Sequence, residues 1–145
     1  MQSLHYLLMK THTTFSRRVV TRAQRELGLS PGQPKVLDFL IDHPGCDQKT
    51  IAAHCEIEQA TLGSILLRME EKGLIQRQHP PGNRRSLLVD LTGQGQAVAQ
   101  AMAGIFQEEE SAAASRLTPA QLEQLKALLQ LVCQGITGEE EVTRP

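Results

Sequence analysis

The sequence predicts a mainly α-helical protein, a winged helix-turn-helix domain with N- and C-terminal helices that form a dimerisation region. Composition is the first reason, because aromatic residues make up only 3% of the 145 residues, tryptophan is absent, and leucine and alanine are frequent. The second reason is the segment from residue 47 to residue 91, where two short helical patterns precede two alternating strands around a Pro-Gly-Asn tip. The third is a long amphipathic pattern on each side of that segment.

The first predicted element is a long helix over residues 3–27 that ends at Gly28, a residue that tolerates a left-handed backbone. One stripe of this helix is apolar and consists of Leu4, Leu8, Phe15, Val19 and Leu27. The other face is basic and carries Lys10, Arg17, Arg18, Arg22 and Arg25. Contact with flanking phosphates, pairing with the acids of a partner subunit and exposure to solvent are all open for this basic face.

A second helix is predicted to begin at the sequence Ser30-Pro31-Gly32-Gln33, which has the form of a capping box. Ser30 is the expected cap, Pro31 occupies the first helical position, and the side chain of Gln33 reaches back. Pro34 lacks an amide hydrogen, but this costs little so close to the start of a helix. The segment His43-Pro44-Gly45 ends the helix.

Residues 47–73 contain the predicted helix-turn-helix. Asp47 is the expected cap of the first helix, because its carboxylate can accept from the free amides of the first turn, and residues 55–57 form the turn. The recognition helix is expected over Gln59–Lys72, with Glu58 as a possible cap and Gly73 as the stop. Its buried stripe consists of Leu62, Ile65, Leu66 and Met69. Its opposite face offers small or polar groups, namely Gln59, Thr61, Gly63, Ser64 and Arg68.

The opposite face of the recognition helix is the predicted DNA-contact surface. In a major groove, the N-terminal half of a helix meets base edges, and its amides and positive dipole end face phosphates. We also expect contacts from the start of the preceding helix, at Gln48, Lys49 and Thr50.

A two-stranded ribbon is predicted after the recognition helix, over residues 74–78 and 86–91, with Leu87, Val89 and Leu91 on one face. Its tip presents Arg84 and Arg85. A guanidinium on a narrow hairpin suits a minor groove, where the negative potential of AT-rich DNA is enhanced. The predicted DNA contacts of the ribbon are Arg77, Asn83, Arg84 and Arg85.

Two further helices are predicted after the ribbon, the first capped by Thr92 and the second opened by a capping box at Thr118-Pro119-Ala120-Gln121. Their apolar stripes are Val98, Met102, Ile105 and Phe106 in the first and Leu122, Leu125, Leu129, Val132 and Ile136 in the second. A two-fold partner would bury these stripes, and a two-fold dimer matches a pseudo-palindromic operator. We therefore predict dimerisation helices at 1–28 and 92–138, a DNA-binding region at 29–91 and an acidic tail at 139–145.

In these segments the chain resembles the MarR-type bacterial transcription regulators. The order and spacing of the shared segments carry the resemblance, which covers about two thirds of the chain strongly. The segments are Leu29-Ser30-Pro31-Gly32-Gln33, Gln59-Ala60-Thr61-Leu62, Met69-Glu70-Glu71-Lys72-Gly73-Leu74-Ile75-Gln76-Arg77, Asn83-Arg84-Arg85 and Leu91-Thr92-Gly93-Gln94-Gly95. The resemblance implies a homodimeric, sequence-specific DNA-binding regulator, most often a repressor, which a small phenolic or aromatic acid releases from double-stranded DNA.

The chain departs from the pattern of that family at two places. The family usually has an aspartate where this chain has Asn83, and that aspartate braces the arginine at the position of Arg85. In the recognition helix, the family often has a hydroxyl residue followed by an arginine where this chain has Gly63 and Ser64. A glycine inside a helix costs about 1 kcal/mol relative to alanine, so Gly63 indicates either a close approach to the DNA backbone or simple divergence of the operator.

Charge is unevenly distributed along the chain, although the formal net charge is only −1. The predicted DNA-binding segment from residue 59 to residue 85 contains five cations and two anions, whereas acidic runs lie at residues 108–110 and 139–141. A basic DNA-binding segment with acidic ends and a solvated surface of mixed charge are both compatible with this pattern.

The sequence contains no phosphate-binding glycine loop and no set of nucleophile, base and orienting residue, so we expect no enzyme activity and no cofactor. Three cysteines without a disulfide framework, no apolar run long enough to cross a bilayer and no signal-peptide pattern predict a cytoplasmic protein. One cluster has metal-ligand residue types, His43, Cys46, His54 and Cys55, but its spacing is not that of a closed zinc site, and we predict no metal.

The family resemblance implies a ligand pocket between the dimerisation region and the DNA-binding domain. Phe15, Arg18, Phe39 and His43 are candidates for its lining. Two alternatives stay open. One is a DNA-binding redox or metal sensor that uses Cys46, Cys55 or Cys133. The other, which the missing aspartate and arginine suggest, is a winged-helix interaction module that no longer binds DNA.

Overall fold

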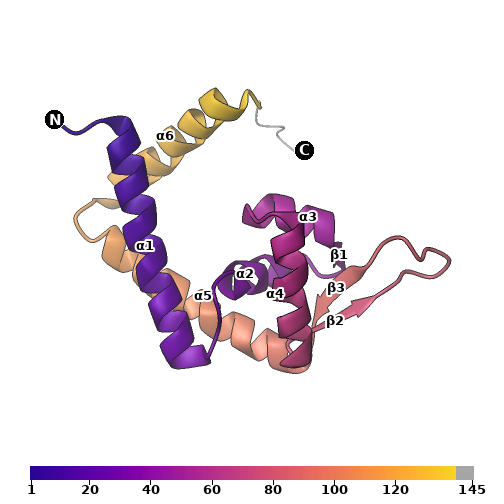
Figure 1. Ribbon diagram of the computed structural model, residues 1–145. Helices are drawn as coiled ribbons and strands as arrows, with labels where there is room; N and C mark the ends of the chain where they lie inside the picture. The colour runs from indigo at the N-terminus through magenta and orange to yellow at the C-terminus, as the bar shows by residue number, and fades with distance from the viewer. Residues whose placement is uncertain (140–145) are drawn as a thin grey trace. The chain divides into compact units, whose positions relative to one another are not determined.

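A computed structural model describes residues 1–139 (Figure 1). Among these residues the order of elements is α1 (Leu4–Leu27), α2 (Gln33–Asp42), β1 (Cys46–Asp47), α3 (Gln48–Cys55), α4 (Gln59–Glu71), β2 (Ile75–Gln78), β3 (Leu88–Leu91), α5 (Gly93–Ala113) and α6 (Pro119–Thr137). The chain divides into two compact units, Met1–Glu109 and a second unit that begins at Glu110. Of the predicted acidic tail, all but Glu139 lies outside the described residues. The expected fold class, mainly helical with a winged helix-turn-helix, is confirmed.

Both ends of α1 are held by local signals. The Ser3 side chain accepts from the amide of Tyr6, and Gly28 ends the helix in the left-handed conformation with φ of 66°. The predicted capping box at Ser30 is only half correct. Gln33 Oε1 does accept from the Ser30 amide at 3.0 Å, but the cap is Gly32, with φ of 88° and no side-chain bond. Pro31 and Gly32 form a turn, so α2 starts at Gln33 and Pro34 lies in its first turn.

The wing belongs to a three-stranded antiparallel sheet with the order β1-β3-β2, although the sequence predicted only two strands. Strand β1 is short and pairs Cys46 with Val89. The β2–β3 pairing runs from Ile75 opposite Leu91 to Gln78 opposite Leu88, and the hairpin extends away from the helices (Figure 1). Strand β2 ends at Gln78 as predicted, whereas β3 begins at Leu88 and not at residue 86, because Pro80 and Pro81 have no amide hydrogen to continue the ladder.

The core of the first unit fixes the orientation of α4. Leu62, Leu66 and Met69 are fully buried. They belong to one cluster with residues from α1, α2, α3, the sheet and α5, among them Ala23, Leu37, Ile51, Val89 and Met102. Each buried aliphatic side chain contributes about 1.5–3 kcal/mol relative to exposure. A rotation of α4 about its axis would expose Leu62, Leu66 and Met69, so their burial holds the polar face of the helix outward.

The start of α5 is attached to the end of the wing region. Thr92 Oγ1 accepts from the Gly95 amide at 2.9 Å and donates to the Gly73 carbonyl oxygen at 2.6 Å, which confirms Thr92 as a cap. Gly95 packs against the backbone of Leu74 so closely that a Cβ there would lie 1.9 Å from the Leu74 carbonyl oxygen. The recognition helix, the wing and α5 therefore meet at one rigid joint.

The second unit contains α6, and the predicted capping box at its start is confirmed. Thr118 and Gln121 exchange bonds of 2.9 and 3.2 Å between side chain and backbone. None of the residues of α6 is buried in this single chain. Its exposed large apolar residues are Leu125, Leu128, Leu129, Leu131 and Ile136.

Candidate nucleic-acid interface

The helix-turn-helix is assembled by local contacts. Asp47 Oδ1 accepts from the Thr50 amide at 2.7 Å, so the predicted cap of α3 is confirmed, and this bond keeps the pKa of Asp47 below its usual value. Glu56 ends α3 with φ of 54°, a left-handed conformation that is uncommon for a residue other than glycine. Glu58 occupies the cap position of α4 as predicted, but its side chain makes no capping bond.

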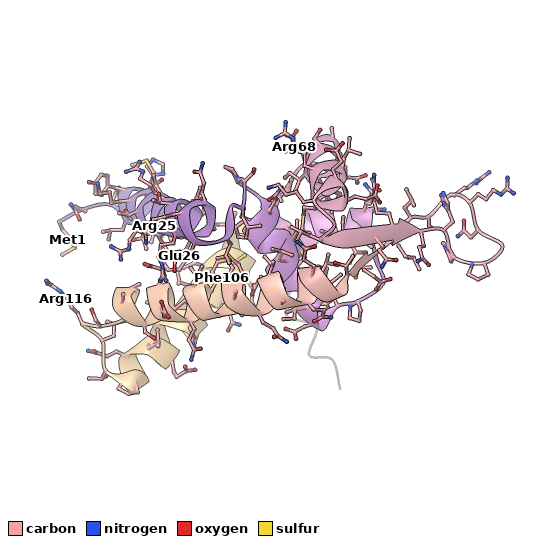
Figure 2. All side chains as sticks on the ribbon, turned by 90° about the horizontal axis from the view of Figure 1, so that it is seen from below. Met1, Arg25, Glu26, Arg68, Phe106 and Arg116 are labelled. Carbon is pink, nitrogen blue, oxygen red and sulfur yellow. The ribbon has the colours of Figure 1, made fainter. Side chains whose placement is uncertain are left out.

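One face of α4 is available to DNA over its whole length. Gln59, Thr61, Ser64 and Arg68 are exposed, and Gly63 is partly exposed. The Arg68 side chain projects from the outer side of the helix (Figure 2). A Cβ on Gly63 would meet no atom within 4 Å, so no packing contact within the described chain requires a glycine at that position.

The start of α3 lies beside this face. Lys49 and Gln59 line one shallow groove, together with Glu56, Ile57 and Glu58. Lys49 and Thr50 are exposed, whereas Gln48 is half-buried. The structure thus brings Lys49 of the predicted α3 contacts close to the N-terminal end of the recognition helix, where a phosphate would also meet free amides.

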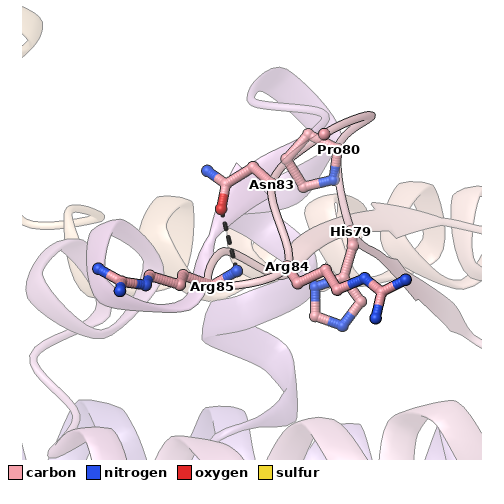
Figure 3. Close-up of a pocket in the computed structure, with 6 residues that line it drawn as sticks. His79, Pro80, Asn83, Arg84 and Arg85 are labelled. Atoms are coloured by element: carbon pink, nitrogen blue, oxygen red, sulfur yellow. Dashed lines mark hydrogen bonds between the residues drawn. The ribbon is translucent and has the colours of Figure 1, made fainter.

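The wing tip displays two arginines on a turn that hydrogen bonds hold together. Asn83 Oδ1 accepts from the backbone amide of Arg85 at 2.9 Å (Figure 3). Asparagine therefore does brace Arg85, but through its backbone and not its guanidinium. Arg84 and Arg85 are exposed, and their side chains extend in opposite directions from the tip (Figure 3).

Arg77 has a structural partner that the sequence analysis did not anticipate. Its guanidinium forms two bonds of 3.2 Å to the carboxylate of Glu70, and its side chain is only 18% exposed. The guanidinium holds the pKa of Glu70 below its usual value. This pair connects β2 to the C-terminal turn of α4, and a contact between Arg77 and DNA stays a prediction.

Comparison with known proteins identifies the family. The family model described as MarR family matches residues 29–87. The transcriptional regulator HosA of Escherichia coli O127:H6 is 32% identical over 112 residues, which are 77% of this chain and 81% of HosA. The chain belongs to the MarR family. It is a DNA-binding transcriptional regulator and not an enzyme.

Two other relatives of this MarR-family regulator cover most of the chain. The HTH-type transcriptional repressor Rv2887 of Mycobacterium tuberculosis is 27% identical over 127 residues, which are 88% of this chain and 91% of Rv2887. The structure of the S. aureus MepR–DNA complex superposes with a TM-score of 0.85 at 24% identity, and the match covers 93% of this chain and 99% of MepR. A shorter match to HosA of E. coli O111:H- spans 58% of that protein at 36% identity.

The four candidate ligand residues of this MarR-family regulator do not come together. Phe15 lines a cavity of about 240 Å³ together with His12, Val19, Lys35 and Phe106 of α5. Phe39 and His43 lie elsewhere, in an aromatic stack in which Phe39 sits 4.3 Å from His43 and 4.4 Å from His54 between ring centroids.

Arg18, the fourth candidate, is engaged in a cluster of charges between α1 and α5. Its Nε lies 2.7 Å from Glu109 Oε2, and Arg22 contacts the same carboxylate at 3.2 Å and Glu108 at 2.8 Å. The Glu109 side chain is 5% exposed, and hydrogen bonding to Arg18 lowers its pKa. Part of the basic face of α1 therefore pairs with acids of its own chain, an option that the sequence analysis did not include.

The cysteines differ in exposure. Cys55 is buried at the end of α3 and Cys46 is half-buried in β1, and burial raises the pKa of both thiols, which disfavours the reactive thiolate. Cys133 on α6 is exposed. Within residues 1–139, no three His, Cys, Asp or Glu side chains are placed to hold a metal ion. No helix in the described part of the chain is long and apolar enough to cross a membrane.

Proposed function

We propose that this MarR-family regulator is a homodimeric repressor that binds a pseudo-palindromic operator and dissociates when a small aromatic acid binds. The exposed polar face of α4, held outward by a fully buried stripe, is the observation that carries the DNA-binding part. Thr61, Gln59 and Ser64 contact bases or phosphates of the major groove, and Arg68 contacts the backbone. The wing arginines enter the minor groove or meet its rim. Such a protein acts on the bacterial chromosome, which places it in the cytoplasm.

The exposed apolar residues of α6 support the homodimer. A helix with Leu125, Leu128, Leu129 and Leu131 between 42% and 62% exposed is unusual on a soluble monomer. The N-terminal half of α1 also exposes Leu4, Leu7 and Met9. A second copy of the chain is the simplest partner that covers both helices, because a two-fold axis also presents two recognition helices to the half-sites of a palindrome.

The cavity beside Phe15 supports a small aromatic effector. Its volume of about 240 Å³ exceeds the roughly 150 Å³ that holds a benzene ring in a protein interior, so a single substituted ring fits. Phe15, Val19 and Phe106 provide an apolar wall. Lys35 also lines the cavity, and its ammonium, which donates to the Cys55 carbonyl oxygen at 3.4 Å, would have to turn toward the cavity to bind a carboxylate. Of the predicted ligand residues, this proposal retains Phe15. Arg18 stays a candidate only if the ligand displaces Glu109.

Repression and release can be tested on one DNA fragment. We would select a duplex from a random pool with the purified protein and titrate the protein against it by fluorescence anisotropy at several salt concentrations. Binding that is tight, selective over a scrambled duplex and steeply weakened by salt is expected. On a template that carries the duplex over a promoter, transcription should fall, and benzoate or salicylate should restore it. Weak and equal binding to both duplexes would argue against an operator-binding repressor.

Dimerisation is tested separately, by sedimentation of the wild-type chain and of Leu129→Glu. The wild type should sediment as a dimer, and a charge in the apolar face of α6 should produce monomers. A wild-type monomer at micromolar concentration would contradict the proposed dimer.

A further inference from the structure

The tip of the wing lacks backbone hydrogen-bond donors at two prolines on one of its two sides. The β2–β3 ladder ends at the pair Gln78 and Leu88. Beyond it, Pro80 and Pro81 have no amide hydrogen, so neither residue can donate a backbone bond across the hairpin. The Pro80 carbonyl oxygen accepts from the Asn83 amide at 3.0 Å, but that bond closes the turn and does not join the two sides. The two arginines that we propose to contact DNA, Arg84 and Arg85, therefore lie on a segment, residues 79–87, without a strand ladder.

A histidine side chain supplies the missing bond. The Nδ1 atom of His79 lies 2.9 Å from the carbonyl oxygen of Ser86 on the opposite side of the loop. A carbonyl oxygen can only accept, so the Nδ1 atom must carry the proton and donate. This bond begins one residue after the last ladder pair and takes the place of the backbone donor that Pro80 lacks.

The bond from His79 is part of a continuous brace around the tip. Asn83 Nδ2 lies 3.5 Å from Ser86 Oγ, and Asn83 Oδ1 accepts from the Arg85 amide at 2.9 Å. Arg84 and Arg85 lie between the two residues, Asn83 and Ser86, that this brace joins. The brace consists of amide, hydroxyl, carbonyl and imidazole groups, so it places no carboxylate beside the two guanidinium groups.

We propose that His79 is a positioning residue of the DNA-binding wing, whose Nδ1–H donated to Ser86 closes the loop and pre-orders Arg84 and Arg85 for the minor groove. The proposal rests on the proposed role of the wing in DNA binding. Its energetic basis is that a loop ordered before binding loses less conformational entropy when it binds. His79 itself need not touch DNA, and it differs in this respect from the arginines.

Three substitutions at His79 separate positioning from direct contact. In His79→Asn the side-chain amide nitrogen reaches the region of Nδ1, in His79→Gln it reaches the region of Nε2, and in His79→Ala both donors are lost. One neutral hydrogen bond contributes about 0.5–1.5 kcal/mol, so we expect His79→Ala and His79→Gln to weaken binding to the selected duplex by roughly 2- to 12-fold. His79→Asn should stay within about twofold of the wild type by the same relation.

A measurement on the free protein makes the test independent of DNA. Nitrogen NMR should show the His79 ring as the Nδ1–H tautomer, and the backbone amides of Arg84 and Arg85 should become more mobile in His79→Ala but not in His79→Asn. Equal mobility and equal affinity in all three variants would refute the positioning role. Retained affinity in His79→Gln but not in His79→Asn would instead indicate a direct contact of Nε2 with DNA. If the wild type bound no duplex, the proposed function would fail, while the NMR result would still decide whether His79 orders the tip.

Discussion

Replacement of Arg85 by alanine tests the wing most directly. The Arg85 side chain is exposed and makes no ion pair within the described residues, so its loss should not destabilise the fold. The Asn83 bond uses the backbone amide of Arg85, which alanine retains. The change therefore isolates the guanidinium, and its contact with DNA contributes about 1–3 kcal/mol. This corresponds to a loss of about 5- to 150-fold in affinity.

The assay is a titration of the selected duplex by fluorescence anisotropy over a range of salt concentrations. If Arg85 meets a phosphate, the slope of log affinity against log salt should become shallower by about 1. Arg116→Ala is a matched control, because Arg116 is also exposed but lies outside the first unit, after α5. Sedimentation should show the same assembly state for both variants.

The outcome that would refute this reasoning is specific. Equal affinity and equal salt slope for Arg85→Ala and Arg116→Ala would show that Arg85 does not contact DNA. A loss of more than 1000-fold, or a lowered thermal midpoint, would show that Arg85 supports the fold or the wing in a way that its exposed position does not indicate.

Three further predictions concern the scaffold. Asp47→Ala should lower the free energy of unfolding by about 1 kcal/mol, because the Thr50 amide loses its acceptor, whereas Asp47→Asn should change little at neutral pH; calorimetry distinguishes them. The pKa of Glu109 in the folded protein lies below its ordinary value of 4.5, so the carboxylate stabilises the fold fully above that pH, and this stabilisation is lost as the pH falls further. Glu109→Gln should therefore flatten the acid side of the curve of thermal midpoint against pH. An unchanged curve would contradict the role of the Arg18–Glu109 pair. Gly95→Ala should lower the free energy of unfolding by about 3 kcal/mol or more, because the new Cβ would meet the Leu74 backbone. Gly104→Ala in the same helix meets no atom within 4 Å and should raise the free energy of unfolding by about 1 kcal/mol. Denaturant unfolding of the two variants should therefore give changes of opposite sign.

Sequence reasoning predicted which side chains of α4 and of the wing tip are exposed, whereas their contacts with DNA stay predictions. The exposed face of α4 follows from the period of its apolar stripe, and the arginines of the wing follow from a proline-glycine tip between two alternating segments. His79 was missed. The available signal was a donor side chain placed directly before two prolines that end a strand, but its partner Ser86 is seven residues away and the loop conformation decides whether they meet.

The sequence could not decide which of the candidate effector residues lines a cavity. Phe15 and Phe39 are both aromatic residues on apolar helix faces, and the sequence offers no way to tell which one lines a cavity. Their separation is decided by how α1, α2 and α5 pack. Phe39 contacts two histidines, one from the next turn of its own helix and one from α3, whereas Phe15 faces Phe106 across a cavity.

The sequence by itself determined the elements whose causes lie within one turn of chain. Local groups a few residues apart decide where these helices begin and end. Examples are the Asp47 cap, the Thr118 capping box and the glycines that follow helices at Gly28 and Gly73. The tertiary structure alone decided the third strand, the Arg77–Glu70 pair and the cluster around Glu109, whose partner Arg18 is 91 residues away. The physical reason is that hydrogen-bonded and ionic contacts act over only a few ångströms, so groups distant in sequence interact only after the packed core has brought them together.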